Sequence, residues 1–256
     1  MQELDLKILS RCFWRTYLIG SAFNTRGLQN IGLIYALDPG LRVLYSDEKK
    51  LIKARKRYLK LYNSHPFWAP LLVGIFLFLE QKIARGLVPA NMLPKLKSTM
   101  VYTLSAIGDS FFGGSLLITW SLSTILLLFC GLNRLAVFWM VLWFIGLQLF
   151  KVYTFYKGFS EGLAFLNRLK NWDLINLGSV FKTVNAFLLL VIWYLIWPEP
   201  ISWLQFCSLV LSIGILALIF SKFLCSREVL VWLMFIGVVF WSRIVEFCQG
   251  LLHRLY

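Results

Sequence analysis

The sequence predicts an all-α, polytopic helical membrane protein with an N-terminal amphipathic helical region, a re-entrant or broken-helix element and about five transmembrane helices. The first observation is composition: 59% of the 256 residues are hydrophobic and only 15% are charged, whereas soluble domains are about 25% charged. The second is that apolar residues gather in stretches close to the length of a membrane-spanning helix. The third is that basic residues fall in alternate connections, as the positive-inside rule requires.

Residues 1–66 are expected to form basic, amphipathic helices that do not cross the membrane. Apolar residues from Leu41 to Tyr62 recur at helical intervals, which suits a helix at a membrane interface or one packed on its neighbours. We expect Asp38-Pro39-Gly40 to break the chain before this helix and Ser64-His65-Pro66 to close it. The net charge of +14 includes a dense basic run that indicates contact with membrane lipid, and no nucleic acid is expected. The run comprises Lys49, Lys50, Lys53, Arg55, Lys56, Arg57 and Lys60.

Residues 67–130 are expected to hold a re-entrant segment followed by an interrupted helix. The apolar stretch from Phe67 to Leu79 has 13 residues, fewer than the roughly 20 that a crossing needs. Basic residues flank this stretch on both sides, so both of its ends are expected in the cytoplasm. A re-entrant hairpin or a tilted half-helix fits these observations, and a full crossing does not.

Residues 131–256 are expected to form the C-terminal transmembrane helices. The connection from Lys151 to Lys170 is basic and should be cytoplasmic, whereas the connection from Trp197 to Pro200 has no basic residue and should face outward. The resulting model places the N-terminus inside and the C-terminus outside after five crossings. The predicted spans are Met100 to Cys130, Leu135 to Val152, Val180 to Trp197, Trp203 to Phe223 and Val229 to Phe247.

Asp109 is the most unusual residue of the apolar region. A carboxylate at membrane depth costs at least about 2.5–3.5 kcal/mol unless it faces protein or water. Glycines Gly108, Gly113 and Gly114 surround it and are candidate positions for a break in the backbone. A broken helix at this depth would line a substrate cavity. Alternatively, Asp109 lies near the interface and caps the helix that follows.

Four further polar residues flank the short apolar stretch. Asn63 and His65 precede it, and Glu80 and Gln81 follow it. They are candidates for substrate binding or for the translocation core together with Asp109. The alternative interpretation is a helix cap with a buried, hydrogen-bonded histidine.

Catalytic and metal-binding motifs are not found. The sequence has no phosphate-binding loop, nucleophile elbow or zinc-protease motif, and its five cysteines lack the spacing of metal ligands. We therefore expect no catalytic residue, no metal and no cofactor. An integral membrane enzyme that uses Asp109, His65 or Glu80 as acid or base is disfavoured, because nothing assembles a nucleophile, a base and an oxyanion donor.

Three motifs resemble one known family, the IID components of the mannose/fructose/sorbose phosphotransferase systems. Asn63-Ser64-His65-Pro66 is similar to the family's Asn-Thr-His-Pro, and Leu79-Glu80-Gln81 to its Leu-Glu-Glu. Ile107-Gly108-Asp109 with Phe111, Phe112 and Gly114 resembles the family's Gly-Asp-x-x-Phe-Trp-Gly segment. Phe23-Asn24 with Arg26, Gln29 and Gly32 resembles a third motif. The resemblance covers about residues 10 to 165, and the remainder agrees in hydropathy.

The resemblance implies a non-catalytic permease subunit in the bacterial inner membrane. Such a subunit forms the sugar translocation unit with a IIC membrane subunit, as an oligomer of IIC–IID pairs. Phosphoenolpyruvate-dependent phosphoryl transfer to a hexose-class sugar is carried out by cytoplasmic IIA and IIB components. Asn63, His65, Glu80 and Asp109 would lie in or near the shared core.

The sequence also departs from the family pattern. Gly113 stands in place of Trp, Leu117-Ile118 in place of Arg-Pro, and Tyr102-Thr103 in place of Gly-Pro. These departures leave open a second hypothesis, in which the chain is a divergent membrane interaction or regulatory subunit that no longer transports.

Overall fold

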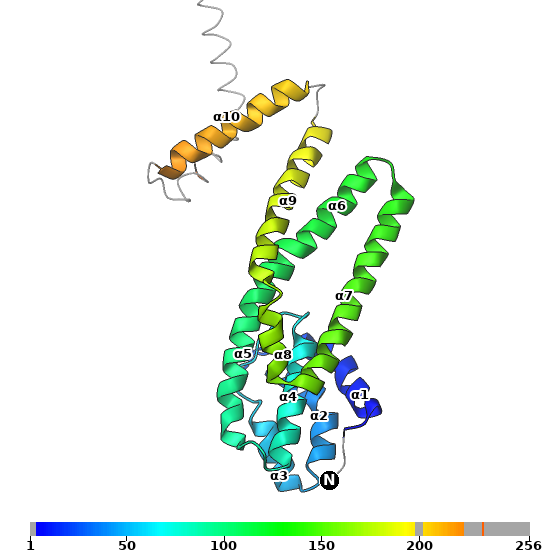
Figure 1. Cartoon of the computed structure of the whole chain (residues 1–256), viewed down its shortest axis with the longest axis vertical. Helices are drawn as coiled ribbons and strands as arrows, with labels where there is room; N and C mark the ends of the chain where they lie inside the picture. Colours follow the sequence, from blue (N-terminus) through cyan, green and yellow to red (C-terminus); the bar gives the residue numbers. More distant parts are fainter. Residues whose placement is uncertain (1–3, 198–201, 223–231, 233–256) are drawn as a thin grey trace, which may run out of the picture. The chain divides into compact units, whose positions relative to one another are not determined.

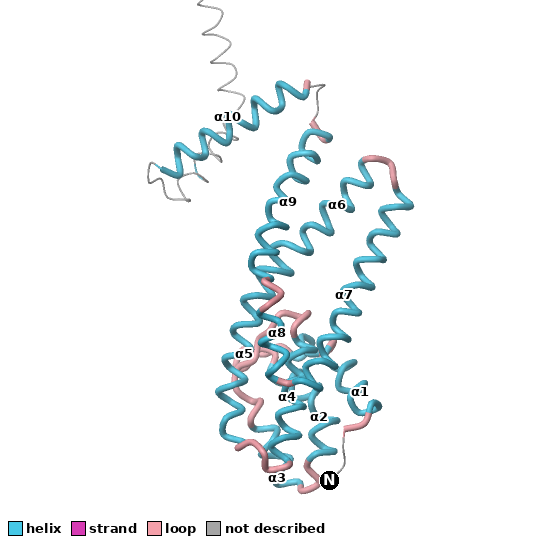
Figure 2. The backbone as a smooth tube through the Cα atoms, viewed as in Figure 1, coloured by secondary structure: helices cyan, strands magenta, loops and turns pink. Residues whose placement is uncertain are grey.

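The computed structural model describes residues 4–197, 202–222 and 232. This part of the chain is helical and contains no β-strand, apart from two isolated bridges, which confirms the all-α prediction. Residues 1–195 form one compact unit, and residues 196–256 form a second. In the first unit, short helices pack into an N-terminal body, and α6, the upper part of α7 and α9 project from it (Figure 1). The longer loops lie within the body (Figure 2).

The N-terminal body contains α1 (Leu6–Thr16), the 3₁₀ helix η1 (Ile19–Ala22), α2 (Asn30–Leu44), α3 (Glu48–Lys56) and α4 (Ala69–Ala84). The rest of the first unit consists of η2 (Ala90–Met92), α5 (Leu93–Gly108), the π-helix η3 (Asp109–Leu116), α6 (Leu117–Phe129), α7 (Asn133–Glu161), α8 (Leu163–Lys170) and α9 (Leu174–Leu195). The second unit contains α10 (Trp203–Lys222).

The predicted break at Asp38-Pro39-Gly40 is wrong, because α2 continues through Pro39 to Leu44. Proline lacks an N–H, so the carbonyl of Tyr35, four residues earlier, loses its helical partner. Arg15 of α1 compensates: its Nη1 donates to Tyr35 O over 3.1 Å, and its guanidinium lies 4.2 Å from the centroid of the Tyr35 ring. A neighbouring helix therefore makes the internal proline tolerable.

The chain instead breaks at residues 45–47, so the expected amphipathic helix is divided between α2 and α3. Asp47 begins α3 by accepting a hydrogen bond from Lys49 N over 2.9 Å. Leu51 and Ala54 of α3 are buried. This helix therefore packs on its neighbours, which is one of the two arrangements that the sequence predicted. Part of the basic run is also structural, because Arg55 pairs with Asp38 and Arg57 with Glu80.

The stretch expected to be a hairpin or half-helix forms one continuous helix, α4, at the centre of the body. Its apolar residues extend around the whole circumference, as in a helix buried on all sides. Glycines allow α7 to approach closely: a Cβ on Gly74 would lie 2.3 Å from Phe155 O, and one on Gly158 would lie 2.7 Å from Leu71 O. Gly158 thus serves close packing within this chain, and Gly162 (φ 59°) ends α7.

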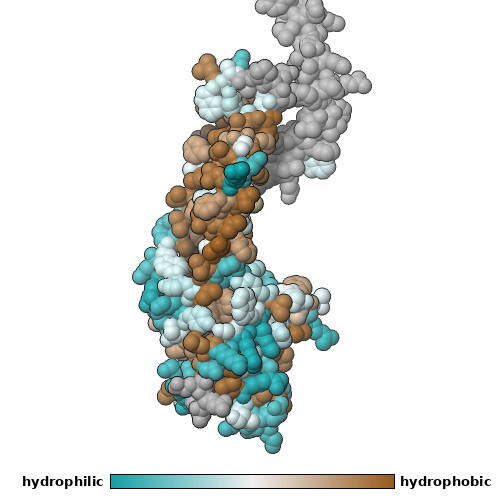
Figure 3. Space-filling view, turned by 90° about the vertical axis from the view of Figure 1, so that its right-hand side faces the viewer, coloured by the Kyte–Doolittle hydropathy of each residue, from teal (hydrophilic) through white to brown (hydrophobic). Residues whose placement is uncertain are grey.

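Three helical segments of the described residues are long and apolar enough to cross a membrane: Ala90–Phe129, Asn133–Glu161 and Leu174–Leu195. They correspond to the first three predicted spans, although α7 continues nine residues past Val152 to Glu161 and α9 begins six residues before Val180. The fourth predicted span coincides with α10, whereas the fifth, Val229 to Phe247, lies outside the described residues. Apolar surface dominates the projecting helices and polar surface the body (Figure 3).

Candidate functional site

The predicted break around Asp109 takes the form of a change in helical winding. The backbone passes without interruption from α5 through the π-helix η3 into α6. Gly108 allows this segment to contact the body, because a Cβ there would lie 2.5 Å from His65 Cβ. Asp109 does not cap the following helix, since it has αR geometry within the helix and makes no capping hydrogen bond. Short π-helical insertions occur frequently at functional sites.

The wider π turn is held by side-chain hydrogen bonds. Ser115 Oγ donates to Phe111 O over 2.6 Å, and Asn185 Nδ2 of α9 donates to Ser115 O over 3.0 Å. Gly114 has only Asp109 O and Lys182 Cε near its missing Cβ, at 3.3 and 3.9 Å, and Gly113 has nothing within 4 Å. α9 thus packs on the π-helix through a polar contact.

His65 lies beside the π-helix in a half-buried position between aromatic rings. Its ring centroid is 5.3 Å from that of Phe112 and 5.5 Å from that of Phe67, with nearly parallel planes. Burial lowers the pKa of His65, Asp109 opposes this effect, and the positive charge of Lys151 lowers the pKa further. The imidazole is therefore neutral at pH 7 and has one donor and one acceptor nitrogen.

Asn63 and Asp109 are exposed near this histidine. The loop that carries Asn63 is anchored to α4, since His65 O accepts hydrogen bonds from Trp68 N and Ala69 N over 2.9 and 3.1 Å. Ser110 is also exposed, and Lys182 Nζ of α9 lies 3.5 Å from Ser110 Oγ. The structure thus brings together His65, Gly108 and Asp109 and adds Lys182, while exposed Asn63 lies two residues before His65 in the same loop.

Glu80 and Gln81 lie at the opposite end of α4, a helix of 16 residues that is about 24 Å long at 1.5 Å per residue. Glu80 is fully buried. Arg57 binds both of its oxygens, with Nε 3.0 Å from Oε1 and Nη2 in contact with Oε2. The hydroxyls of Tyr45 and Tyr58 donate to the same carboxylate over 2.7 and 2.9 Å. Each Glu80 oxygen therefore accepts two hydrogen bonds.

Tyr45 and Tyr58 remain protonated donors to Glu80. Burial raises the pKa of both phenols well above the usual value, and the negative charge of Glu80 raises it further. The arrangement joins α2, the turn after α3 and α4, so it stabilises the body. The sequence analysis did not identify Arg57 as the partner of Glu80, because Arg57 lies in a run of basic residues that is typical of a membrane-facing surface.

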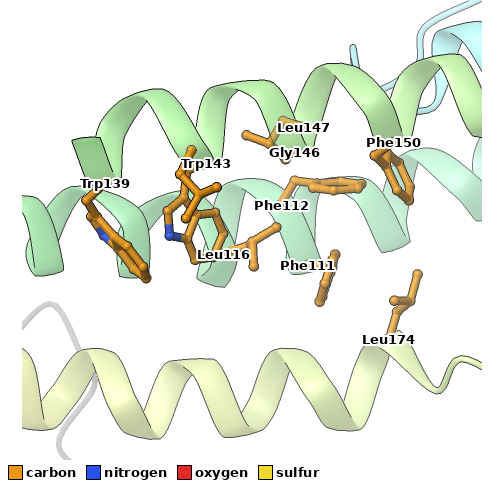
Figure 4. A pocket seen from close by; sticks show the side chains of 10 residues that line it. Phe111, Phe112, Leu116, Trp139, Trp143, Gly146, Leu147, Phe150 and Leu174 are labelled. Atoms are coloured by element: carbon orange, nitrogen blue, oxygen red, sulfur yellow. The ribbon is translucent and has the colours of Figure 1, made fainter. Parts of the chain in front are cut away.

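A cavity of about 530 Å³ lies between η3, α7 and the first residue of α9, on the side of the π-helix that carries Phe112 (Figure 4). Its lining side chains are aromatic or aliphatic, and the only polar groups among them are the indole N–H groups of Trp139 and Trp143. The indole of Trp139 already donates to Ser123 Oγ over 2.8 Å. This cavity suits apolar groups rather than the hydroxyls of a sugar.

Solved structures of similar fold are membrane proteins. One, described as the structure of a membrane protein, matches with a TM-score of 0.69 and 18% identity, over 94% of this chain and 98% of that chain. A cryo-EM structure of the mannose transporter ManYZ in complex with microcin E492 matches with a TM-score of 0.58 and 18% identity over the same shares. At this identity the likeness concerns the fold.

Curated relatives match over part of their length. The mannose-specific EIID component of Escherichia coli strain K12 is 29% identical over 105 residues, which is 40% of this chain and 37% of the relative. The fructose permease IID component of Bacillus subtilis strain 168 is 25% identical over 116 residues, which is 45% and 42% of the two chains. The aligned part thus spans less than half of each relative.

The family model of the mannose/fructose/sorbose IID component matches residues 3–197, so the match continues beyond the motifs that end near residue 165. It includes the loop with His65, the buried α4 and the π-helix with Asp109. This chain therefore belongs to the mannose/fructose/sorbose family of phosphotransferase-system IID components.

Proposed function

We propose that this chain is the IID-type subunit of a phosphoenolpyruvate-dependent sugar permease in the bacterial inner membrane. It forms the translocation unit for a hexose-class sugar with a IIC-type membrane subunit, in an oligomer of IIC–IID pairs. Phosphoryl transfer is the task of cytoplasmic IIA and IIB components. Family membership over residues 3–197 supports the subunit role.

The observation that carries the proposal is a group of exposed polar side chains on helices that are apolar enough to cross a membrane. Asp109, Ser110 and Lys182 are exposed, and all three belong to such segments. Because charged groups at membrane depth are costly in lipid, this face must meet protein or water. A second membrane subunit with complementary polar groups satisfies that requirement.

His65, Asn63 and Asp109 are the side chains that we assign to sugar recognition in the shared core. The Asn63 amide offers donors and an acceptor, and the Asp109 carboxylate offers acceptors. Neutral His65 offers its Nε2–H donor, because its Nδ1 accepts from Phe67 N over 3.4 Å. Sugar hydroxyls both donate and accept, so this set matches them. Gly108 contributes by letting the π-helix approach the loop. We assign Glu80, with Gln81 beside it, to the stability of the body.

Extraction in mild detergent tests the partnership. We expect the chain to be recovered with an equally hydrophobic IIC-type subunit, and substitution of Lys182 with leucine to weaken this association. Exposed Lys170 at the end of α8, replaced with leucine, serves as the control. A stable monomer that retains no membrane partner would contradict the proposal.

Sugar uptake by cells that depend on this protein tests the assigned site. Asp109→Asn should lower uptake by about tenfold or more, because loss of one charged hydrogen bond to a ligand is worth about 1.5–3 kcal/mol. Glu48→Gln, which neutralises an exposed carboxylate of α3, should leave uptake unchanged. Protein levels in the membrane must be equal for the comparison to count.

One observation favours the second hypothesis, a subunit that no longer transports. The site of Gly113, where the family pattern has a tryptophan, is open, since a Cβ there would meet nothing within 4 Å. Unchanged uptake in Asp109→Asn would support this hypothesis and oppose a role of Asp109 in sugar recognition.

A further inference from the structure

A second, smaller cavity lies beside the Asn63–Pro66 loop, which contributes Ser64 and Pro66 to its lining. Its volume is about 160 Å³, and it lies between the end of α1, the loop and α7. Unlike the lining of the large apolar cavity, its lining includes several polar side chains, which alternate with Ile19, Gly20, Pro66 and Ala69. The polar residues are Thr16, Tyr17, Gln29, Ser64 and Lys151. None of them belongs to the group that we assign to sugar recognition.

Lys151 is the only charged residue in this lining. The side chain is half-buried, and Nζ lies 4.5 Å from the centroid of the Tyr17 ring and 4.8 Å from that of Phe67. Within residues 4–197, the ammonium forms neither an ion pair with a carboxylate nor a hydrogen bond. A cation taken out of water is costly unless acceptors replace the water, and aromatic faces replace it only in part. Three N–H donors of Lys151 thus lack an acceptor.

The other polar groups of the cavity divide into two sets. Thr16 Oγ1 donates to Phe13 O over 2.6 Å, and the Tyr17 hydroxyl donates to Gln148 Oε1 over 2.7 Å, so both hydroxyl protons are used. Gln29 Oε1 accepts from Ser64 N over 3.2 Å, and this bond orients the amide and leaves its two N–H donors without a partner among the described residues.

Ser64 completes the set of available groups. Its side chain is 4% exposed, and Oγ has no hydrogen-bond partner of normal geometry among the described residues. Burial raises the pKa of the neighbouring Tyr62 hydroxyl, and a side-chain hydrogen-bonding interaction with Ser64 opposes that rise. The Tyr62 hydroxyl also has no partner of normal geometry among the described residues. The cavity therefore offers the free N–H donors of the Gln29 amide beside the Lys151 ammonium, which pairs with no carboxylate among the described residues.

We propose that this cavity is a binding site for a small oxyanion, namely a phosphate group, held by Lys151, Gln29 and Ser64. A phosphate presents several strong hydrogen-bond acceptors and a negative charge that would pair with the Lys151 ammonium. A neutral sugar fits less well, because it brings no negative charge to pair with the Lys151 ammonium. The phosphate belongs either to free inorganic phosphate or to a phosphorylated sugar. The proposal does not rest on the proposed function.

The test uses the full chain, purified in a non-ionic detergent together with any membrane partner that it retains. Binding of inorganic phosphate, glucose 6-phosphate and glucose is measured by isothermal titration calorimetry. We expect saturable binding of at least one phosphate compound, weakened by about tenfold or more in Lys151→Met, because charge-assisted hydrogen bonds are lost. Tighter binding of glucose 6-phosphate would identify a sugar phosphate as the ligand, and equal binding would identify the phosphate group alone.

Two variants separate the site from general charge and folding. Lys157→Met removes a cation from the same helix, but one already paired with Glu161 at 3.0 Å, and should leave binding unchanged. Lys151→Arg keeps the charge and should retain binding that Lys151→Met loses. The proposal is overturned if neither phosphate compound binds, if Lys157→Met is as harmful as Lys151→Met, or if glucose binds and the phosphates do not. Uptake and partner association are measured separately, so these outcomes leave the proposed function to its own tests.

Discussion

Replacing Glu80 with alanine should destabilise the N-terminal body by about 3–5 kcal/mol, because removal of one partner from a buried ion pair leaves the other charge uncompensated. Arg57 would keep a guanidinium whose side chain is only 14% exposed, and Tyr45 and Tyr58 would lose their acceptor. Thermal unfolding in detergent, followed by intrinsic fluorescence, measures the effect as a lower transition temperature.

Two controls distinguish this explanation from a direct role of Glu80 in transport. The double variant Arg57→Met, Glu80→Leu should be more stable than Glu80→Ala, because a buried pair is often replaced by apolar residues at little cost. Glu48→Ala removes an exposed carboxylate and should change stability by about 0.5 kcal/mol or less. If Glu80→Ala unfolds like the wild type but loses uptake, the structural assignment is wrong and Glu80 belongs to the translocation core.

Substituting Gly74 with alanine should be equally disruptive, at about 3 kcal/mol or more. The new Cβ would meet Phe155 O at 2.3 Å and Phe159 N at 3.0 Å. Overpacking of a core by side chains costs about 1–3 kcal/mol, and here the opposing atoms belong to the backbone of α7, which cannot move aside as a side chain can. The transition temperature and the yield of folded protein report the effect.

Gly146 provides the matched control on α7. A Cβ at Gly146 meets nothing within 4 Å, so Gly146→Ala should be neutral or stabilising by up to about 1 kcal/mol through higher helix propensity. Gly158→Ala, whose Cβ would lie 2.7 Å from Leu71 O, should resemble Gly74→Ala. Equal stability of Gly74→Ala and Gly146→Ala would show that α4 and α7 are not packed as closely as described.

Transmembrane helices and family motifs were predictable because both are local features. A long apolar stretch between basic connections predicts a crossing wherever it packs, and the three spans among the described residues agree. The motifs around His65 and Asp109 also indicate the family, since each consists of a few residues that lie close together along the chain. The helix limits were less accurate, since α7 continues past Val152 to Glu161, where Thr154, Phe155 and Gly158 are buried, and α9 begins at Leu174, six residues before the predicted start.

Pro39 and Arg57 show where local reasoning fails. A proline normally predicts the end of a helix, but Arg15 from α1 satisfies the carbonyl that Pro39 leaves free. An arginine among lysines normally predicts an exposed surface, but Arg57 reaches a carboxylate 23 residues away. In both cases a side chain from another helix supplies the missing partner, and no local pattern encodes it.

The amino-acid sequence was sufficient to predict a helical membrane protein and to indicate its family, and it also suggested Asn63, His65 and Asp109 as candidate site residues. The folded arrangement was needed to separate His65 from Glu80, to reveal the π-helix at Asp109, and to place Lys151 beside a small cavity with Gln29 and Ser64. The physical reason is that hydropathy and motifs act over a few helical turns. Whether a charge can be buried depends, in contrast, on whether a helix distant in the sequence supplies its counter-charge.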